Sequence, residues 1–160
     1  MSQMNIIIDV DKCTGCRLCE SICSVNKEGE SNPFKSRIYV EEYIIEGMRV
    51  PRVCINCADP KCIPACPTEA LTKDEVTGWT MLNDDECIQC GACLEACPYG
   101  GIRATKDDRI IKCNLCGGDP ECVQVCVTQA ITFATREPQK VTQARKSLET
   151  FASLQETMVA

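Results

Sequence analysis

The hydrophobic and polar positions predict several short strands along most of the chain. The clearest is "RIYVEEYII" (37–45), which belongs to a strand pair that follows a polar linker within residues 24–53. Two similar stretches, "NIIIDVDKC" (5–13) and "WTMLNDDEC" (79–87), each predict a strand that leads into a cysteine. The repetition of this lead-in strand indicates that the chain contains an internal repeat.

A hairpin and a closing strand are predicted in the same way. "ALT" (70–72) and "WTML" (79–82) flank the turn sequence "DEVTG" (74–78), which is typical of two antiparallel strands. "CVTQAITFA" (126–134) predicts a similar strand after the last cysteine, whereas no equivalent strand follows Cys23.

The last residues have a helical pattern instead. In residues 138–160, led in by Pro138, apolar positions recur every three or four residues: Val141, Ala144, Leu148, Phe151, Leu154 and Met158. Charged residues gather on the opposite side: Arg145, Lys146, Glu149 and Glu156. We expect an amphipathic helix over 135–160 that docks on another subunit or mediates self-association, with packing against its own chain as the alternative.

The composition changes this picture because cysteine accounts for 16 of the 160 residues and histidine for none. Three Phe, three Tyr and one Trp leave little material for a conventional core, so something besides side-chain packing must stabilise the fold. The start "MSQMNIIIDVDKC" (1–13) has no signal-peptide pattern, and we expect a cytoplasmic, reduced protein. No apolar run approaches the roughly 20 residues that cross a bilayer, so no membrane span is expected.

The sixteen cysteines form four groups. They are Cys13, Cys16, Cys19 and Cys23; Cys54, Cys57, Cys62 and Cys66; Cys87, Cys90, Cys93 and Cys97; and Cys113, Cys116, Cys122 and Cys126. The first and third groups share the spacing C-x2-C-x2-C-x3-C, and the second and fourth carry Asp-Pro before a delayed third cysteine. This alternation favours an ancestral duplication.

Three chemistries compete for these thiols. A disulfide network conflicts with a reducing compartment. Structural zinc usually takes two well separated C-x2-C pairs, often with histidine. The C-x2-C-x2-C-x3-C run is instead the signature of bacterial ferredoxins, and four complete groups favour four 4Fe-4S clusters. Small residues within the groups, Gly15 and the pair Gly91 and Ala92, would let backbone amides approach a cluster, although a simple tight turn also explains them.

The pairing of the groups follows from the fourth cysteine. The third and fourth cysteines are four residues apart, roughly 6 Å along a helix, and in this motif the fourth ligates the neighbouring cluster. We interpret groups two and three as one module inserted into another made of groups one and four, with sequential pairing as the alternative. The four ligand sets are then the 13 set (Cys13, Cys16, Cys19, Cys126), the 113 set (Cys113, Cys116, Cys122, Cys23), the 54 set (Cys54, Cys57, Cys62, Cys97) and the 87 set (Cys87, Cys90, Cys93, Cys66).

The expected fold class is α+β, with two pseudo-symmetric bacterial-ferredoxin-like modules that each bind two 4Fe-4S clusters, plus the C-terminal amphipathic helix. Residues 1–23 and 108–134 form the first module, 24–53 the linker and strand pair, 54–107 the inserted module and 135–160 the docking helix.

Three stretches carry a family resemblance: "RVPRVCINCADPKCIPACPTEALT" (49–72), "CIQCGACLEACPYGGIRA" (87–104) and the fourth cysteine group. Over residues 4–134 the chain resembles the four-cluster iron–sulfur subunits of the dimethyl sulfoxide reductase type, which include electron-transfer subunits of formate dehydrogenases and hydrogenases. Some relatives replace a cysteine of the third group with Trp and hold a three-iron cluster. All four cysteines are present here, so the resemblance implies four-iron clusters throughout, in a minimal member without a membrane-anchoring extension.

Electron transfer is the function that this chemistry favours. A cluster with four cysteine ligands has no open position for substrate, and no histidine is present for acid–base work, so the chain is not expected to be an enzyme by itself. The formal charge of -6 falls to roughly -14 if each cluster adds about -2, which excludes nucleic acid as a probable partner. The expected partners are a catalytic oxidoreductase subunit, such as a tungsten or molybdenum enzyme or a hydrogenase, and a second redox partner or reductase subunit. The alternative is a structural or redox-sensing metal protein without a relay function.

Overall fold

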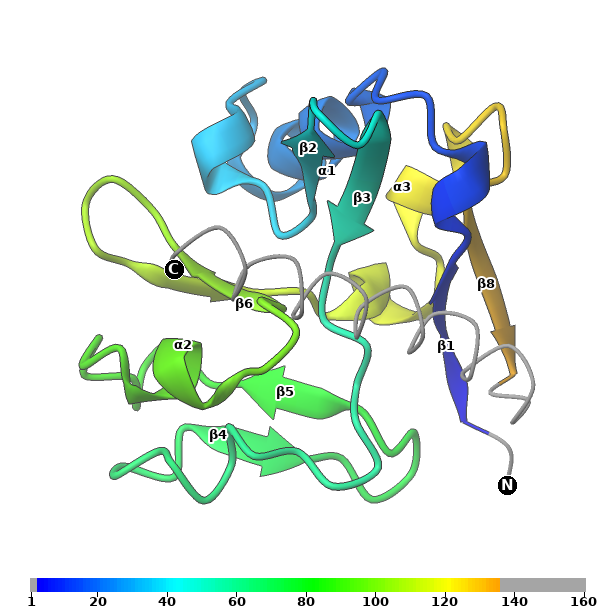
Figure 1. Ribbon diagram of the computed structural model, residues 1–160. Helices are drawn as coiled ribbons and strands as arrows, with labels where there is room; N and C mark the ends of the chain where they lie inside the picture. The colour runs from blue at the N-terminus through cyan, green and yellow to red at the C-terminus, as the bar shows by residue number, and fades with distance from the viewer. Residues whose placement is uncertain (1–2, 136–160) are drawn as a thin grey trace.

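The computed structural model describes residues 3–135, and its ribbon is shown in Figure 1. The predicted helix over 135–160 therefore lies outside the described residues, apart from Thr135 itself. No helix among residues 3–135 is both long and apolar enough to cross a membrane.

The strands form four separate two-stranded antiparallel sheets. They pair β1 (Met4–Ile8) with β8 (Ile131–Thr135), β2 (Tyr39–Tyr43) with β3 (Met48–Arg52), β4 (Leu71–Lys73) with β5 (Thr80–Leu82), and β6 (Ile102–Ala104) with β7 (Ile110–Lys112). The strands predicted from the sequence are all present. The fold is ferredoxin-like, with mixed helix and sheet content.

The sheet β1–β8 joins two segments that are far apart in the sequence (Figure 1). Ile6 lies opposite Phe133 in the register, and Ile6 and Ile131 are both buried because they face the same interior. Trp79, from the turn that leads into β5, caps this sheet: its indole Nε1 donates to the Met4 carbonyl at 2.8 Å, and its ring lies 6.5 Å from that of Phe133. The sheet thus holds the first and fourth cysteine groups together.

The helices begin next to the cysteines but differ from the prediction. They are α1 (Leu18–Glu28), α2 (Ala92–Ala96) and α3 (Glu121–Gln124), with the 3-10 turns η1 (Val10–Lys12), η2 (Pro33–Lys35) and η3 (Leu115–Gly118). Only α1 carries both its third and fourth cysteines, Cys19 and Cys23. In groups three and four the helix ends before the fourth cysteine, so the predicted helical clamp is only partly formed there.

The helix predicted between Cys62 and Cys66 is wrong, because this segment consists of turns. Pro64 has no N–H to donate to the carbonyl of Pro60, which is the bond that would close a first helical turn. The chain makes tighter bonds instead, from Ile63 N to Pro60 O at 3.2 Å and from Cys66 N to Ile63 O at 3.0 Å.

The polar linker predicted to begin at residue 24 is also corrected, since residues 24–28 continue α1. The helix ends at Gly29, whose φ of 74° is left-handed and whose N–H donates to the Val25 carbonyl. Next to this end, Glu28 forms ion pairs with Arg37 and Arg109, which tie the end of α1 to the β6–β7 hairpin. That hairpin crosses residue 107, where we set the boundary of the inserted module.

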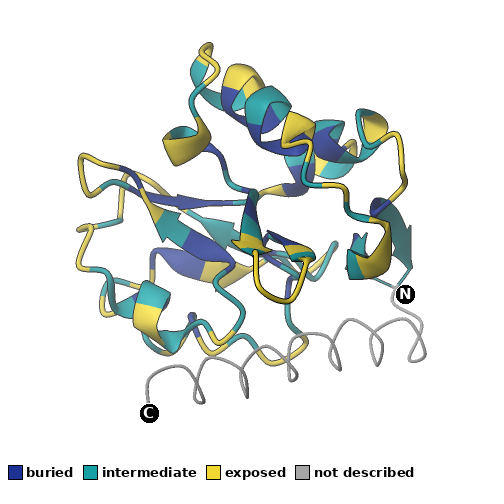
Figure 2. Ribbon diagram, turned by 45° about the horizontal axis from the view of Figure 1, so that its top comes forward, coloured by how far each residue is buried: buried dark blue, intermediate teal, exposed yellow. Residues whose placement is uncertain are grey.

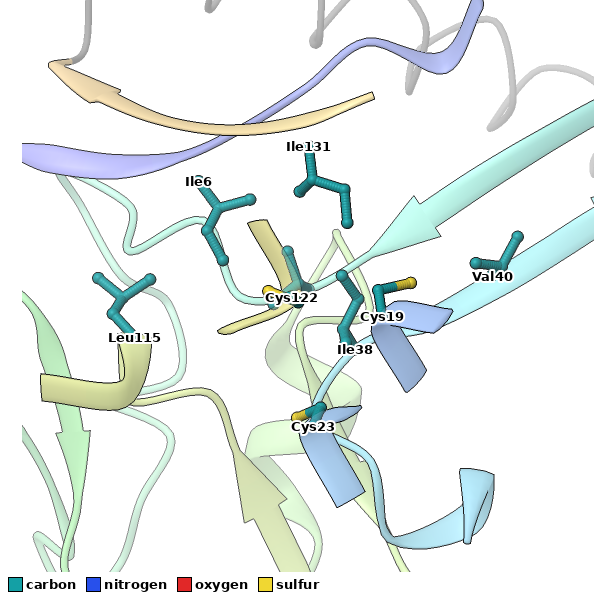
Figure 3. Packing of buried hydrophobic residues seen from close by; sticks show 9 residues of the cluster. Ile6, Cys19, Cys23, Ile38, Val40, Leu115, Cys122 and Ile131 are labelled. Atoms are coloured by element: carbon teal, nitrogen blue, oxygen red, sulfur yellow. The ribbon is translucent and has the colours of Figure 1, made fainter. Parts of the chain in front are cut away.

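Buried residues form two separate cores, in which strand residues are buried while many turn residues are exposed (Figure 2). The larger core contains nine residues: Ile6, Cys19, Cys23, Ile38, Val40, Val53, Leu115, Cys122 and Ile131. Figure 3 shows eight of them converging from both ends of the described chain. The smaller core contains Cys62, Leu71, Cys93, Ile102 and Ile110. Cysteines of groups one and four share one core, and those of groups two and three share the other.

Candidate iron–sulfur site

A left-handed residue precedes the second cysteine in every group. The four residues are Gly15, Asn56, Gln89 and Leu115, with φ between 45° and 72°. Such a residue turns successive backbone N–H groups toward one side of the loop, which creates a concave surface that suits an anion. Glycine and asparagine adopt this conformation readily, but a buried leucine does not, so Leu115 indicates a functional constraint that sequence reasoning missed.

The cysteines of the 113 set line a single cavity. Cys23, Cys113, Cys116 and Cys122 all border it, and it contains about 340 Å³ of space free of protein atoms, part of it open to solvent. Its other walls include the apolar side chains of Ile38 and Leu115. Cys23 comes from α1, far before the other three in the sequence, so the tertiary fold brings it to this cavity.

The electrostatic neighbours of the buried thiols follow the predicted sets. Burial raises the pKa of Cys13, and the thiolates of Cys126 and Cys16 raise it further. Burial likewise raises the pKa of Cys62 to about 11, with a further contribution from Cys54 and Cys97. For Cys93, burial again comes first, and the neighbours that raise its pKa are Cys87, Cys66 and Cys90. Cys57 lies in the same loop as Cys54.

Two relations connect one set with the next. Cys19 of the 13 set is among the thiolates that raise the pKa of Cys122 in the 113 set, after the larger effect of burial. Cys54 of the 54 set similarly raises the pKa of Cys113, which burial and its neighbours bring to about 12. The sets therefore lie in sequence from 13 to 113 to 54, and the Cys62–Cys66 turn continues to the 87 set.

Hydrogen-bond donors approach several sulfur atoms. The amide of Arg37 donates to Cys23 Sγ at 3.4 Å, and that of Gly101 donates to Cys97 Sγ at 3.3 Å. Thr68 and Thr128 place their hydroxyls 3.7 and 3.8 Å from Cys66 Sγ and Cys126 Sγ, at matching positions two residues after the fourth cysteine. Donors to thiolate sulfur are a principal means by which a protein tunes an iron–sulfur cluster.

The donor set fits 4Fe-4S clusters. Residues 3–135 include every cysteine and contain no disulfide, and a soft thiolate suits iron where no histidine is available. Burial raises the pKa of Cys19 to about 12, so without metal this thiol holds its proton at neutral pH, and binding of iron would displace it. Within the described part of the chain no three Cys, Asp or Glu side chains are arranged around a single ion; a cubane instead takes one thiolate at each of its four irons.

Gly101 lies between two cysteines of the 54 set, a role that the sequence did not reveal. A Cβ at this position would lie 2.7 Å from Cys54 Cα, so the backbone of the Cys54 loop would have to move. We expect Gly101→Ala to lower the free energy of unfolding of the holoprotein by about 1–3 kcal/mol and to alter the visible and EPR spectra of its clusters. Gly47→Ala is the control, because its Cβ meets no atom within 4 Å; it should leave the spectra unchanged. Identical spectra for both variants would contradict this role of Gly101.

Four loops of left-handed geometry, lined by buried thiols and held on ferredoxin-like strands, define a protein that binds 4Fe-4S clusters. Family models agree with this class: a 4Fe-4S dicluster domain matches residues 45–136, and a 4Fe-4S binding domain matches residues 6–26.

Similar proteins include the "aliphatic sulfonate oxidoreductase, polyferredoxin-like subunit" of Pyrococcus furiosus, which is 50% identical over 123 residues, covering 76% of this chain and 70% of the relative. A tetrathionate reductase subunit of Archaeoglobus fulgidus is 38% identical over 117 residues, covering 69% of this chain and 53% of the relative. Among solved structures, a chain of the active site complex BamBC of benzoyl coenzyme A reductase with 1,5-dienoyl-CoA matches with a TM-score of 0.52 and 27% identity, covering 86% of this chain and 78% of the other.

The chain belongs to the 4Fe-4S dicluster family, as a polyferredoxin-like iron–sulfur subunit of oxidoreductases. Its function is that of an iron–sulfur electron-transfer subunit. It spans about half the length of several curated relatives, including 57% of the formate dehydrogenase-O iron–sulfur subunit of Escherichia coli.

Proposed function

We propose that the chain binds four 4Fe-4S clusters, one in each of the 13, 113, 54 and 87 sets, and relays electrons along them in the order 13, 113, 54, 87. The observation that carries this proposal is the grouping of the thiols, because the neighbours of Cys13, Cys122, Cys62 and Cys93 include members of the predicted set in each case. The two-module arrangement is supported by the separate cores and by the pairing of β1 with β8.

The two ends of this row are the proposed entry and exit points. The two exposed cysteines are Cys16 and Cys90, which belong to the first and last sets of the row, whereas the two inner sets contain none. An electron can tunnel to a partner only over a short distance, so a cluster near the surface at each end suits contact with two different proteins. This chain is then a carrier between them and not itself the catalyst.

We further propose that the chain is of the dimethyl sulfoxide reductase type and serves a catalytic oxidoreductase subunit in the cytoplasm, with a second redox partner at the other end. The relative from Pyrococcus furiosus makes an oxidoreductase for aliphatic sulfonates the first catalytic partner to consider, because half of its aligned residues are identical. The tetrathionate reductase relative has a sulfur compound in its name as well.

Iron and sulfide analysis tests the proposed cluster content. Anaerobically prepared holoprotein should contain about sixteen irons and about sixteen acid-labile sulfides per chain, because four cubanes use every cysteine. Dithionite should bleach its broad absorption near 400 nm reversibly. A reproducible value near twelve irons after reconstitution would reduce the count to three clusters, and a colourless protein that releases zinc would exclude the relay.

A further inference from the structure

Lys112 is a buried cation at the end of β7, directly before Cys113. Its side chain is 7% exposed, and its ammonium donates to the backbone carbonyls of Thr80 and of Cys113, the latter at 3.0 Å. Among residues 3–135 it forms no ion pair within 4 Å, unlike the buried Glu28, which meets two arginines. Transfer of an unpaired ammonium out of water is strongly unfavourable, and two neutral carbonyls compensate only part of that penalty.

The surroundings of Lys112 identify where its counter-charge belongs. On one side it adjoins Cys113 of the 113 set. On the other it binds Thr80, whose amide donates to Asn56 Oδ1 at 3.0 Å, and Asn56 is the left-handed residue of the loop between Cys54 and Cys57. The Thr80 hydroxyl is itself buried and has no hydrogen-bond partner in the described part of the chain. Lys112 therefore lies where the loops of the 54 and 113 sets meet.

The thiols of both sets respond to this charge. Burial raises the pKa of Cys62 and of Cys113, and in each case Lys112 acts in the opposite direction. A cation that stabilises thiolates on two sides stabilises any anionic group that these thiolates hold. The fully ligated cluster carries about -2 when oxidised and one more negative charge when reduced.

We propose that the Lys112 ammonium is the shared counter-charge of the two inner clusters, those of the 54 and 113 sets, and that it raises their reduction potentials. This inference rests on the proposed four-cluster function. The gain of an electron adds negative charge beside a fixed positive charge in a site of low dielectric constant, so the reduced cluster is stabilised more than the oxidised one. Lys112 is a positioning and tuning residue in this scheme, since no iron is ligated by it.

Two substitutions separate the charge from the hydrogen bonds. Lys112→Gln retains an N–H donor for the two carbonyls but removes the charge, and Lys112→Arg retains the charge. Lys73→Gln is the matched control, because the Lys73 ammonium also donates to a backbone carbonyl, that of Ala58 at 2.8 Å, but on the exposed end of β4. All variants are prepared as full-length holoproteins, assayed for iron, and titrated with dithionite against mediators while the reduced clusters are followed by EPR.

In Lys112→Gln, the ratio of reduced to oxidised cluster at a fixed potential should fall at least about tenfold for one or two of the clusters, which is a shift of about 59 mV for a one-electron couple. Lys112→Arg and Lys73→Gln should titrate as the unmodified protein does. Loss of iron from Lys112→Gln alone would also support the counter-charge role.

Unchanged potentials in fully loaded Lys112→Gln would overturn the inference, and so would loss of iron from both Lys112 variants, which would make the residue a packing element. Failure of the proposed function is a separate result, because it would appear in the unmodified protein as fewer than four clusters or as clusters that cannot be reduced.

Discussion

Removal of iron from the holoprotein is expected to abolish cooperative thermal unfolding. Three of the nine residues in the larger core and two of the five in the smaller one are cysteines, so the thiols that would face the clusters form much of each interior. The rest of the chain supplies four sheets of only two strands, which are marginal without a packed face. Since a domain is stable by only about 5–15 kcal/mol, loss of the metal–thiolate bonds should exceed what the remaining contacts provide.

The measurement is far-UV circular dichroism during heating, on holoprotein and on protein treated anaerobically with an iron chelator and a reductant. The holoprotein should show one or more sigmoidal transitions, and the iron-free chain a shallow, featureless slope from the lowest temperature. Reconstitution with iron and sulfide should restore the transitions, which controls for chemical damage. An iron-free chain with a native-like spectrum and a cooperative melt would refute the dependence on clusters.

Replacing Cys23 with serine is expected to remove one whole cluster, and the identity of that cluster distinguishes the two pairing schemes. Cys23 lines the same cavity as Cys113, Cys116 and Cys122, so we expect the cluster of the 113 set to be lost. The single variant should retain about twelve irons, because the other three sets are complete.

Double variants locate the loss. If Cys23 and Cys116 hold the same cluster, the variant Cys23→Ser with Cys116→Ser should also retain about twelve irons, whereas Cys23→Ser with Cys62→Ser should retain about eight. Sequential pairing of groups one and two predicts the reverse order, since Cys23 and Cys62 would then share a cluster. Iron analysis of the three anaerobic preparations, with EPR of the reduced samples, decides between them.

Some corrections to the predicted fold had local causes that were visible in the sequence. Pro64 prevents a helix between Cys62 and Cys66 because it lacks the required N–H donor. Gly29 ends α1 after residues 24–28 have extended it, and a left-handed glycine is a frequent end for a helix. Either signal could have been used, because each depends on neighbours within one or two turns of the chain.

What the sequence determined by itself is the chemistry of the site: the donor atoms, their division into four loops, and the strands that lead into those loops. This information is local, because a loop of three closely spaced cysteines specifies its own turn and its own ligands. Only the tertiary structure brought Cys23 to the cavity of the fourth group, placed Gly101 against Cys54, held Leu115 in a left-handed conformation and buried Lys112 between two sets. These features depend on segments tens of residues apart meeting in space, and neither composition nor spacing encodes which distant segments will share one interior.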